Sequence, residues 1–148
     1  MKNLLVAIES CEAVTVASPI MQCTIDLASA MSSKVWLLHS VPRARQPPFN
    51  IDDTTLRREV AAEYHHEHEF LQRLAQCLRD RDIEANALLV EGSPVSAILK
   101  EADRLDIDLI ILGCHRSGLL YHALLDATEA GLVGKCPRPI MFIPDPEE

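Results

Sequence analysis

The segment from Leu109 to Pro144 contains the residues whose types and spacing could support chemistry. An apolar stretch, "LIIL", runs into Gly113, and a polar turn with a second glycine, Gly118, comes next. Glycines in such a turn let the backbone approach a phosphate group closely and donate N–H groups to it. No other glycine lies between Leu109 and Asp126. The segment therefore indicates either a nucleotide site or the remnant of one.

The stretch "YHHEHE" is the strongest candidate for a metal site. His65 with His68, or His65 with Glu69, has the spacing at which two side chains of one helix can hold a metal ion. A single helix offers too few ligands to complete such a site, and the sequence shows no further ligand. A solvated helix face is therefore the favoured interpretation, and no metal ligand is assigned.

Two other residues could be reactive or simply structural. Cys114 precedes His115 and Arg116, and cationic neighbours can activate a thiol, as a redox switch requires. A buried cysteine at the end of a strand is the favoured interpretation. His39 lies within an apolar strand pattern, and we expect it to be a hydrogen-bonded core histidine.

The sequence carries no motif that assigns catalysis. It lacks a recognisable Ser-His-Asp arrangement, a motif with paired carboxylates and a Gly-x4-Gly-Lys-Ser/Thr loop. No catalytic residue is predicted, and an enzyme is the least supported class of protein. Slow hydrolysis of ATP stays open.

Short apolar runs alternate with segments of helical periodicity along the chain. The spacing predicts helices over about 18–31 and 53–81, a third that starts at Pro94, and a weaker one over 119–135. Ser18-Pro19 and Ser93-Pro94 each have the pattern of a helix cap followed by proline at the first helical position. The apolar runs predict strands within residues 3–8, 34–41, 83–92, 107–112 and 139–144. The inner stripe of the long second helix is expected at Leu56, Val60, Tyr64, His68, Leu71, Leu74 and Leu78.

This alternation predicts an α/β fold with a mostly parallel sheet that is covered by helices on both faces. In such sheets ligands bind beyond the carboxyl ends of the strands, at the point where the strand order reverses. The loops around Glu9 and Gly113 are therefore the candidate site. No domain boundary is evident, so we expect residues 1–148 to form one domain.

Charge and composition argue against several classes of partner. The 148 residues carry a net charge of −8, whereas nucleic acid or an anionic membrane requires clustered Lys and Arg. No apolar run approaches the roughly 20 residues of a spanning helix, and Leu4 to Ile8 is too short for a signal peptide. Five scattered cysteines without CxxC spacing are typical of reduced thiols. We expect a cytoplasmic protein that binds neither nucleic acid nor membranes.

Four stretches resemble the universal stress protein family and together span nearly the whole chain: "NLLVAIES", "WLLHSV", "VEGSPVSAILKEADRLDIDLIILG" and "CPRPIMFIP". The resemblance implies a five-stranded parallel sheet in the order 3-2-1-4-5, of the adenine nucleotide alpha hydrolase-like type. It also implies a cytoplasmic stress-response role. A homodimer would form through the last strand, at Ile140, Met141, Phe142 and Ile143.

Many members of this family bind ATP, and others do not. ATP-binding members carry Gly-x2-Gly-x9-Gly-Ser/Thr after the fourth strand. Aligned without gaps, Gly113 takes the first glycine, whereas the later motif positions hold Arg116, Asp126 and Ala127. A one-residue deletion near Arg116 is the alternative alignment: it matches "HRSG" to the family but spoils the later matches.

The resemblance places a candidate nucleotide site at Glu9, Val41, Leu112 and Gly113. Glu9 stands where ATP-binding members have Asp, and Val41 and Leu112 match apolar contacts to the nucleotide. Asp126 would repel phosphate, and Ala127 lacks the hydroxyl that would hydrogen-bond to it. We therefore expect a non-catalytic, homodimeric stress-response or regulatory protein with weak or lost ATP binding. The alternative is a sensor that binds ATP or AMP.

Overall fold

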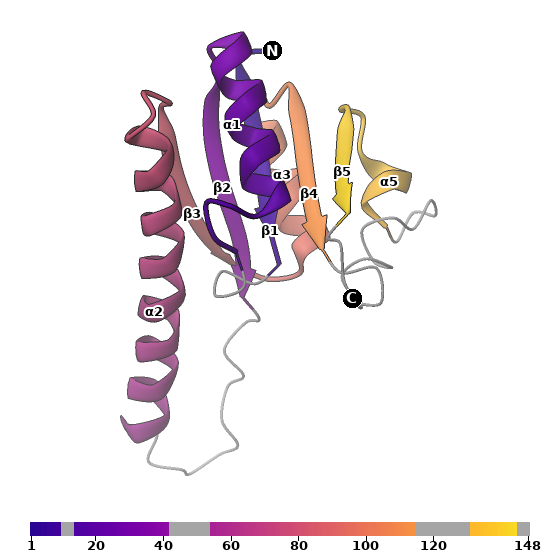
Figure 1. Ribbon diagram of the computed structural model, residues 1–148. Helices are drawn as coiled ribbons and strands as arrows, with labels where there is room; N and C mark the ends of the chain where they lie inside the picture. Colours follow the sequence, from indigo (N-terminus) through magenta and orange to yellow (C-terminus); the bar gives the residue numbers. More distant parts are fainter. Residues whose placement is uncertain (10–13, 42–53, 115–130, 145–148) are drawn as a thin grey trace.

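The computed structural model describes residues 1–9, 14–41, 54–114 and 131–144, with the backbone alone for residues 54–64 and Cys114. Strands and helices alternate along the chain, as the hydrophobic pattern predicts (Figure 1). The strands are β1 (Asn3–Ile8), β2 (Lys34–Val41), β3 (Ala85–Glu91), β4 (Leu109–Cys114) and β5 (Ile140–Pro144). The described helices are α1 (Pro19–Met31), α2 (Thr54–Arg79), α3 (Pro94–Arg104) and α5 (Leu132–Lys135).

The five strands form one sheet in the order β3-β2-β1-β4-β5, and all neighbouring pairs are parallel. This confirms the predicted fold class and strand order. The chain first builds outward from β1 to β2 and β3, and then crosses to β4 on the other side of β1. The order therefore reverses between β1 and β4, and a ligand of this fold is expected at their carboxyl ends.

Helices cover both faces of the sheet (Figure 1). Alternation along each strand sends successive side chains to opposite faces, so each strand contributes to two apolar layers. The first layer lies under α1 and α2 and includes Leu4, Val6, Met21, Leu37, Leu71, Leu78 and Ile111. The second layer lies under α3 and α5 and includes Leu5, Leu38, Ile98, Ile110, Leu112 and Leu132.

Both Ser-Pro pairs start a helix with the serine at the N-cap position, but only one of the two serine side chains makes a capping hydrogen bond. The Ser93 hydroxyl accepts the Ser96 N–H at 3.2 Å, as predicted. The Ser18 side chain makes no cap hydrogen bond; its hydroxyl accepts the Thr15 N–H at 2.9 Å. The predicted N-cap position of Ser18 is confirmed, but its hydroxyl makes no capping bond because it accepts from the turn before α1.

The fourth strand begins at Leu109 rather than at the predicted residue 107. Asp106 has a positive φ of 52°, and the Ile107 N–H donates to the Ala102 carbonyl oxygen at 3.0 Å. Ile107 therefore closes the end of α3, and its apolar side chain fills the second layer instead of starting a strand.

The other helices agree with the sequence where they are described. Leu71, Leu74 and Leu78 are buried beneath α2, and His68 is partly buried. The predicted side chains Leu56, Val60 and Tyr64 lie outside the described residues. Of the helix predicted over 119–135, the described residues contain α5 alone. None of the described helices combines the length and apolar composition that crossing a membrane requires.

Candidate functional site

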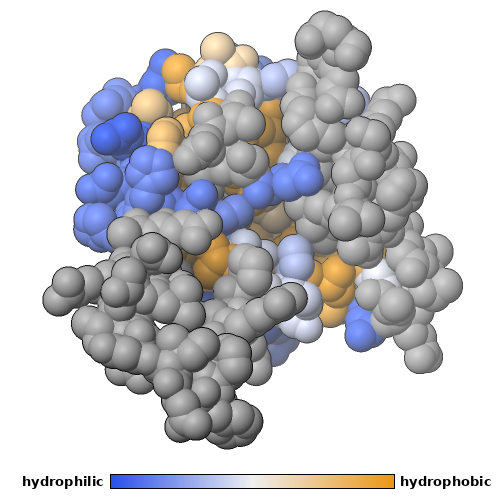
Figure 2. Space-filling view, turned by 90° about the horizontal axis from the view of Figure 1, so that it is seen from below, coloured by the Kyte–Doolittle hydropathy of each residue, from blue (hydrophilic) through white to orange (hydrophobic). Residues whose placement is uncertain are grey.

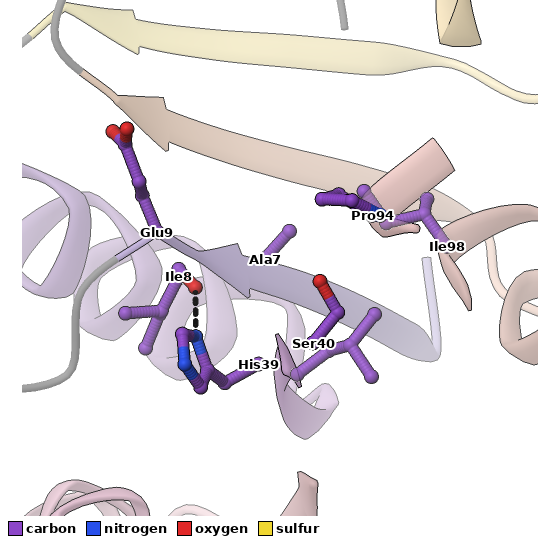
Figure 3. Close-up of a pocket in the computed structure, with 8 residues that line it drawn as sticks. Ala7, Ile8, Glu9, His39, Ser40, Pro94 and Ile98 are labelled. Carbon is purple, nitrogen blue, oxygen red and sulfur yellow. Dashed lines mark hydrogen bonds between the residues drawn. The ribbon is translucent and has the colours of Figure 1, made fainter. Parts of the chain in front are cut away.

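A hollow of about 180 Å³ lies at the carboxyl ends of β1 and β2, beside the start of α3 (Figure 3). It is at the edge of the sheet where parallel α/β folds bind ligands. Seen from that edge, some apolar surface is visible near the middle of the face, and hydrophilic surface lies along its left side (Figure 2). The described residues that line the hollow are Ala7, Ile8, Glu9, Leu38, His39, Ser40, Pro94 and Ile98.

The walls of the hollow are mainly apolar. Ala7 and Leu38 are register partners on β1 and β2, so their side chains share one face of the sheet. Pro94 and Ile98 approach from the first turns of α3, whose start is held by the Ser93 cap. These surfaces suit a flat or aliphatic group better than a charged one.

Glu9 directly follows β1, and its carboxylate extends toward the end of β4 in Figure 3. Among the described lining residues, Glu9 is the only one with a carboxylate, and neither Lys nor Arg is present. The candidate site therefore has negative character where the structure describes it.

His39 joins three elements at the rim of the hollow. Its Nδ1 donates to the Ile8 carbonyl oxygen at 2.8 Å. Its Nε2 lies 3.4 Å from Oε2 of Glu67 on α2, and the two side chains are 11% and 20% exposed. The hydrogen bond expected for His39 is confirmed, but the residue is partly buried at the rim of the hollow and is not part of the core. Its place in the hollow was not predicted, although its position near the carboxyl end of β2 was a usable signal.

Ser40 and His39 are neighbours on β2 but do not act as a pair. Adjacent strand residues project to opposite faces, and Figure 3 shows the Ser40 hydroxyl turned away from the His39 ring. Both ring nitrogens of His39 already face other atoms, those of Ile8 and Glu67. A serine activated by histidine is therefore not assembled among the described lining residues.

The other residues predicted for the nucleotide site do not line this hollow. Val41 ends β2, and its carbonyl oxygen accepts the Gly92 N–H at 2.9 Å. Leu112 is fully buried in the second layer. Gly113 lies on β4 as the register partner of Ile8. The motif positions Arg116, Asp126 and Ala127 lie outside the described residues.

Gly113 has a packing role that the sequence did not reveal. A Cβ at this residue would lie 2.6 Å from Cδ1 of Ile20 and 3.1 Å from its Cβ. Real Cβ atoms essentially never approach a neighbour as closely as the first of these distances. The glycine therefore lets α1 pack directly on β4, whatever occupies the turn that follows.

The histidine-rich part of α2 forms side-chain pairs along the helix. His65 Nε2 lies 3.3 Å from Oε1 of Glu69, and both side chains are exposed. His68 contacts Gln72 at 3.1 Å. No group of three or more potential ligands comes together within the described part of the chain.

A second hollow, of about 380 Å³, lies at the opposite edge of the sheet, near the amino ends of β2 and β3. It is larger, but two of its charged residues pair with each other: Lys34 Nζ lies 2.8 Å from Glu84 Oε2 and 4.7 Å from the centre of the Trp36 ring. The hollow at the carboxyl ends remains the better candidate because it lies where the strand order reverses.

Known proteins resemble this chain in sequence family and in fold. Residues 1–144 match the model of the Universal stress protein family. No curated protein matches the chain.

Solved structures share the fold at low sequence identity. A universal stress family protein from Burkholderia pseudomallei is 17% identical, with a TM-score of 0.70 over 97% of this chain and 96% of that one. UspA from Lactobacillus plantarum is 20% identical, with a TM-score of 0.66 and coverages of 96% and 97%. The universal stress protein from Archaeoglobus fulgidus, solved in complex with dAMP, is 18% identical, with a TM-score of 0.63 and coverages of 97% and 98%.

Proposed function

Because the chain belongs to the universal stress protein family, we propose that it is a non-catalytic regulatory protein of the stress response. In this proposal the protein acts as a cytoplasmic homodimer and binds ATP weakly or not at all. The main support for weak ATP binding is the charge of the hollow. Glu9 is acidic, and no described lining residue is a Lys or Arg that could offset its repulsion of phosphate.

Electrostatic repulsion argues against tight binding of a triphosphate at such a site. A carboxylate 4 Å from one phosphate charge costs about 1 kcal/mol in bulk water and about 4 kcal/mol at an effective dielectric constant near 20. The ungapped alignment adds a second carboxylate, Asp126, and removes a hydroxyl at Ala127. Together, these free-energy costs would weaken ATP binding by orders of magnitude.

The presence of Gly113 does not by itself argue for phosphate binding. Contact with Ile20 already requires a residue without a side chain at this position. The one glycine of the ATP motif that this chain retains therefore has a sufficient structural reason.

The absence of a catalytic role is supported by the geometry of the two residues that could act together. His39 directs its ring nitrogens to Ile8 and Glu67, and Ser40 is turned to the other side (Figure 3). A general base must reach the proton it removes, directly or through one water.

The alternative is a sensor that binds AMP or ATP. Its support is the apolar hollow itself, at the edge where the strand order reverses, together with the Archaeoglobus relative solved with dAMP. A hollow of about 180 Å³ is below the roughly 300–1,000 Å³ of typical ligand pockets, so the described part suits a base better than a whole nucleotide.

Calorimetric titration of nucleotide-stripped protein with ATP, AMP and adenosine, with and without Mg²⁺, tests the proposal. We expect ATP to bind with a dissociation constant of about 1 mM or weaker, which corresponds to about −4 kcal/mol. Binding of ATP near 1 µM would favour the sensor. Formation of ADP by the same preparation would contradict the non-catalytic assignment.

Variants of the motif positions sharpen this test. Asp126→Gly with Ala127→Ser should strengthen ATP binding, since the double change removes a negative charge and restores a hydroxyl. Adding Arg116→Gly should raise the affinity for ATP further if the Arg116 side chain obstructs the turn. It should lower the affinity if the positive charge of Arg116 attracts the phosphates. No gain in either variant would place the obstruction elsewhere, with Glu9 as the first residue to examine.

A further inference from the structure

The pair formed by His39 and Glu67 joins the outer helix α2 to the end of β1. His39 Nδ1 contacts the Ile8 carbonyl oxygen at 2.8 Å, and Nε2 faces Glu67 Oε2 at 3.4 Å. This oxygen is buried, and it has no hydrogen-bond partner among the described residues. A buried carboxylate oxygen without a donor is costly, so the contact with His39 needs an explanation.

The hydrogen-bond chemistry of imidazole supplies one. A carbonyl oxygen only accepts, so Nδ1 of His39 must carry a hydrogen. In a neutral ring, the unprotonated Nε2 would then lie 3.4 Å from the buried oxygen of Glu67, and two electron-rich atoms would face each other without a hydrogen. One proton placed between Nε2 and Oε2 removes this conflict. It can belong to an imidazolium that faces a carboxylate, or to a carboxyl group that donates to the ring.

The other charged groups near His39 favour the same state. Glu9 directly follows β1, which lies on one side of β2, and Glu91 ends β3 on the other side. Both are acidic, so neither opposes a positive ring. Among the residues whose side chains the structure describes, the groups on this layer include Ile20, Met21, Thr24 and Ala28 of α1 and Leu89 of β3, which carry no charge. His66 and His68 of α2 contact Phe70 and Gln72.

The hydrogen bond to Ile8 connects this pair directly to the backbone of the candidate site. The Ile8 carbonyl and the Glu9 N–H belong to one planar peptide unit. An N–H bond to that carbonyl therefore restricts the angle at which Glu9 leaves the strand. Glu9 is the charged residue of the hollow, so its placement depends on a contact that begins on α2.

We propose that His39 and Glu67 hold one proton between them, and that this protonated pair ties α2 to β1 and positions Glu9 at the rim of the hollow. His39 and Glu67 are thus positioning residues. The importance of Glu9 for a ligand rests on the proposed function. The shared proton and the restraint on the Ile8–Glu9 peptide do not depend on that function.

NMR of the full-length protein at pH 7.5 tests the shared proton. Ring ¹⁵N shifts report the protonation of His39, and the side-chain ¹³C shift of Glu67 reports its carboxyl group. Either an imidazolium or a protonated Glu67 supports the proposal. A neutral ring beside an ionised carboxylate would overturn it. His65 serves as the internal reference, because it pairs with Glu69 at 3.3 Å in an exposed position.

Matched variants test the hold on Glu9. Glu67→Gln should give a neutral His39 ring and should move both the Ile8 carbonyl ¹³C shift and the Glu9 amide shift. Glu69→Gln removes the partner of an exposed histidine on the same helix, and it should leave these signals unchanged. Equal responses in both variants would overturn the positioning role.

The pH response provides a readout that loss of packing would not imitate. In the wild type, the Glu9 amide shift should follow the His39 ring signals as the pH rises. In His39→Gln, whose amide can still donate to the Ile8 carbonyl, that response should disappear while the circular dichroism stays native. A pH response that persists in His39→Gln would contradict the proposal. None of these measurements needs a ligand, so they stand apart from the nucleotide titrations.

Discussion

Ile20 of α1 packs against the backbone of Gly113 in β4 so closely that a Cβ at residue 113 would lie 2.6 Å from Ile20 Cδ1. The contact joins the first helix to the strand on which the family places its nucleotide turn. A glycine that resembles a phosphate-binding residue in the sequence is thus also a packing residue in the fold.

Gly113→Ala should lower the free energy of unfolding by about 1–3 kcal/mol, the usual cost of an extra methyl group in a filled core. Ile20→Val removes the Cδ1 atom that the new methyl group would meet. Combining the two substitutions should therefore recover part of the loss, and urea unfolding of both single variants and the double variant measures this coupling. Additive effects would show that Gly113 is needed for another reason.

Ser93→Ala should destabilise the protein by about 1 kcal/mol, because the Ser93 hydroxyl caps α3. Ser18→Ala is the matched control, since Ser18 also precedes a proline at the start of a helix but makes no cap bond. Its effect should stay within about 0.5 kcal/mol. Equal losses in urea unfolding would contradict the difference between the two helix starts.

Asp108 should make the stability depend on pH in the acid range. Backbone N–H groups of Asn3 and Lys2 donate to its carboxylate at 2.9 and 2.8 Å, and they hold the pKa of Asp108 below its ordinary value of 3.8. The folded state thus releases this proton more readily than the unfolded state. The resulting stabilisation is present above about pH 4 and is lost as the pH falls through the lowered pKa.

Asp108→Asn removes this titration while it keeps an oxygen that can accept the same N–H groups. The stability of the wild type relative to this variant, measured by urea unfolding from pH 2 to pH 7, should be highest at the neutral end and should fall toward acid. A difference that stays constant over the whole range would show that the carboxylate charge plays no part.

Ile140→Pro should shift the protein from dimer to monomer if β5 forms the dimer interface. The Ile110 N–H donates to the Pro139 carbonyl oxygen, and alternate residues of a parallel strand bond the same neighbour. The Ile140 backbone therefore faces away from β4, and proline there removes a donor from the outer edge of the sheet.

Ala87→Pro on β3, the opposite edge strand, is the control and should leave the dimer intact. Sedimentation velocity measures both variants. A dimer that survives Ile140→Pro but is lost in Ala87→Pro would place the interface at the other edge.

Much of the architecture could be predicted because it depends on local chemistry. The strands at Asn3–Ile8 and Lys34–Val41 coincide with the apolar runs, since burial on both faces of a parallel sheet requires nearly continuous apolar residues. The start of α3 was equally predictable, because Ser93 and Pro94 satisfy the first turn of the helix whatever packs against it. The strand order came from the resemblance to a family, and the structure confirms it.

The candidate site was less predictable, because its members meet only in three dimensions. The sequence identified Glu9 at the end of the first strand, but it did not bring Ser40, Pro94 and Ile98 to the same hollow. Nor did it show that Glu67, on a helix far along the chain, reaches His39. Such contacts depend on the register between strands and on the rotation of a helix over the sheet, which no local pattern specifies.

The sequence by itself therefore determined the fold class, the alternation of elements and the scarcity of glycine in the segment that follows the fourth strand. These follow from residue type, spacing and charge along one chain. The tertiary structure decided that Gly113 makes room for Ile20, and that His39 holds the peptide of Ile8 and Glu9. The physical reason is that close packing and hydrogen bonds between separate elements are set by distances in space, which residue order alone does not contain.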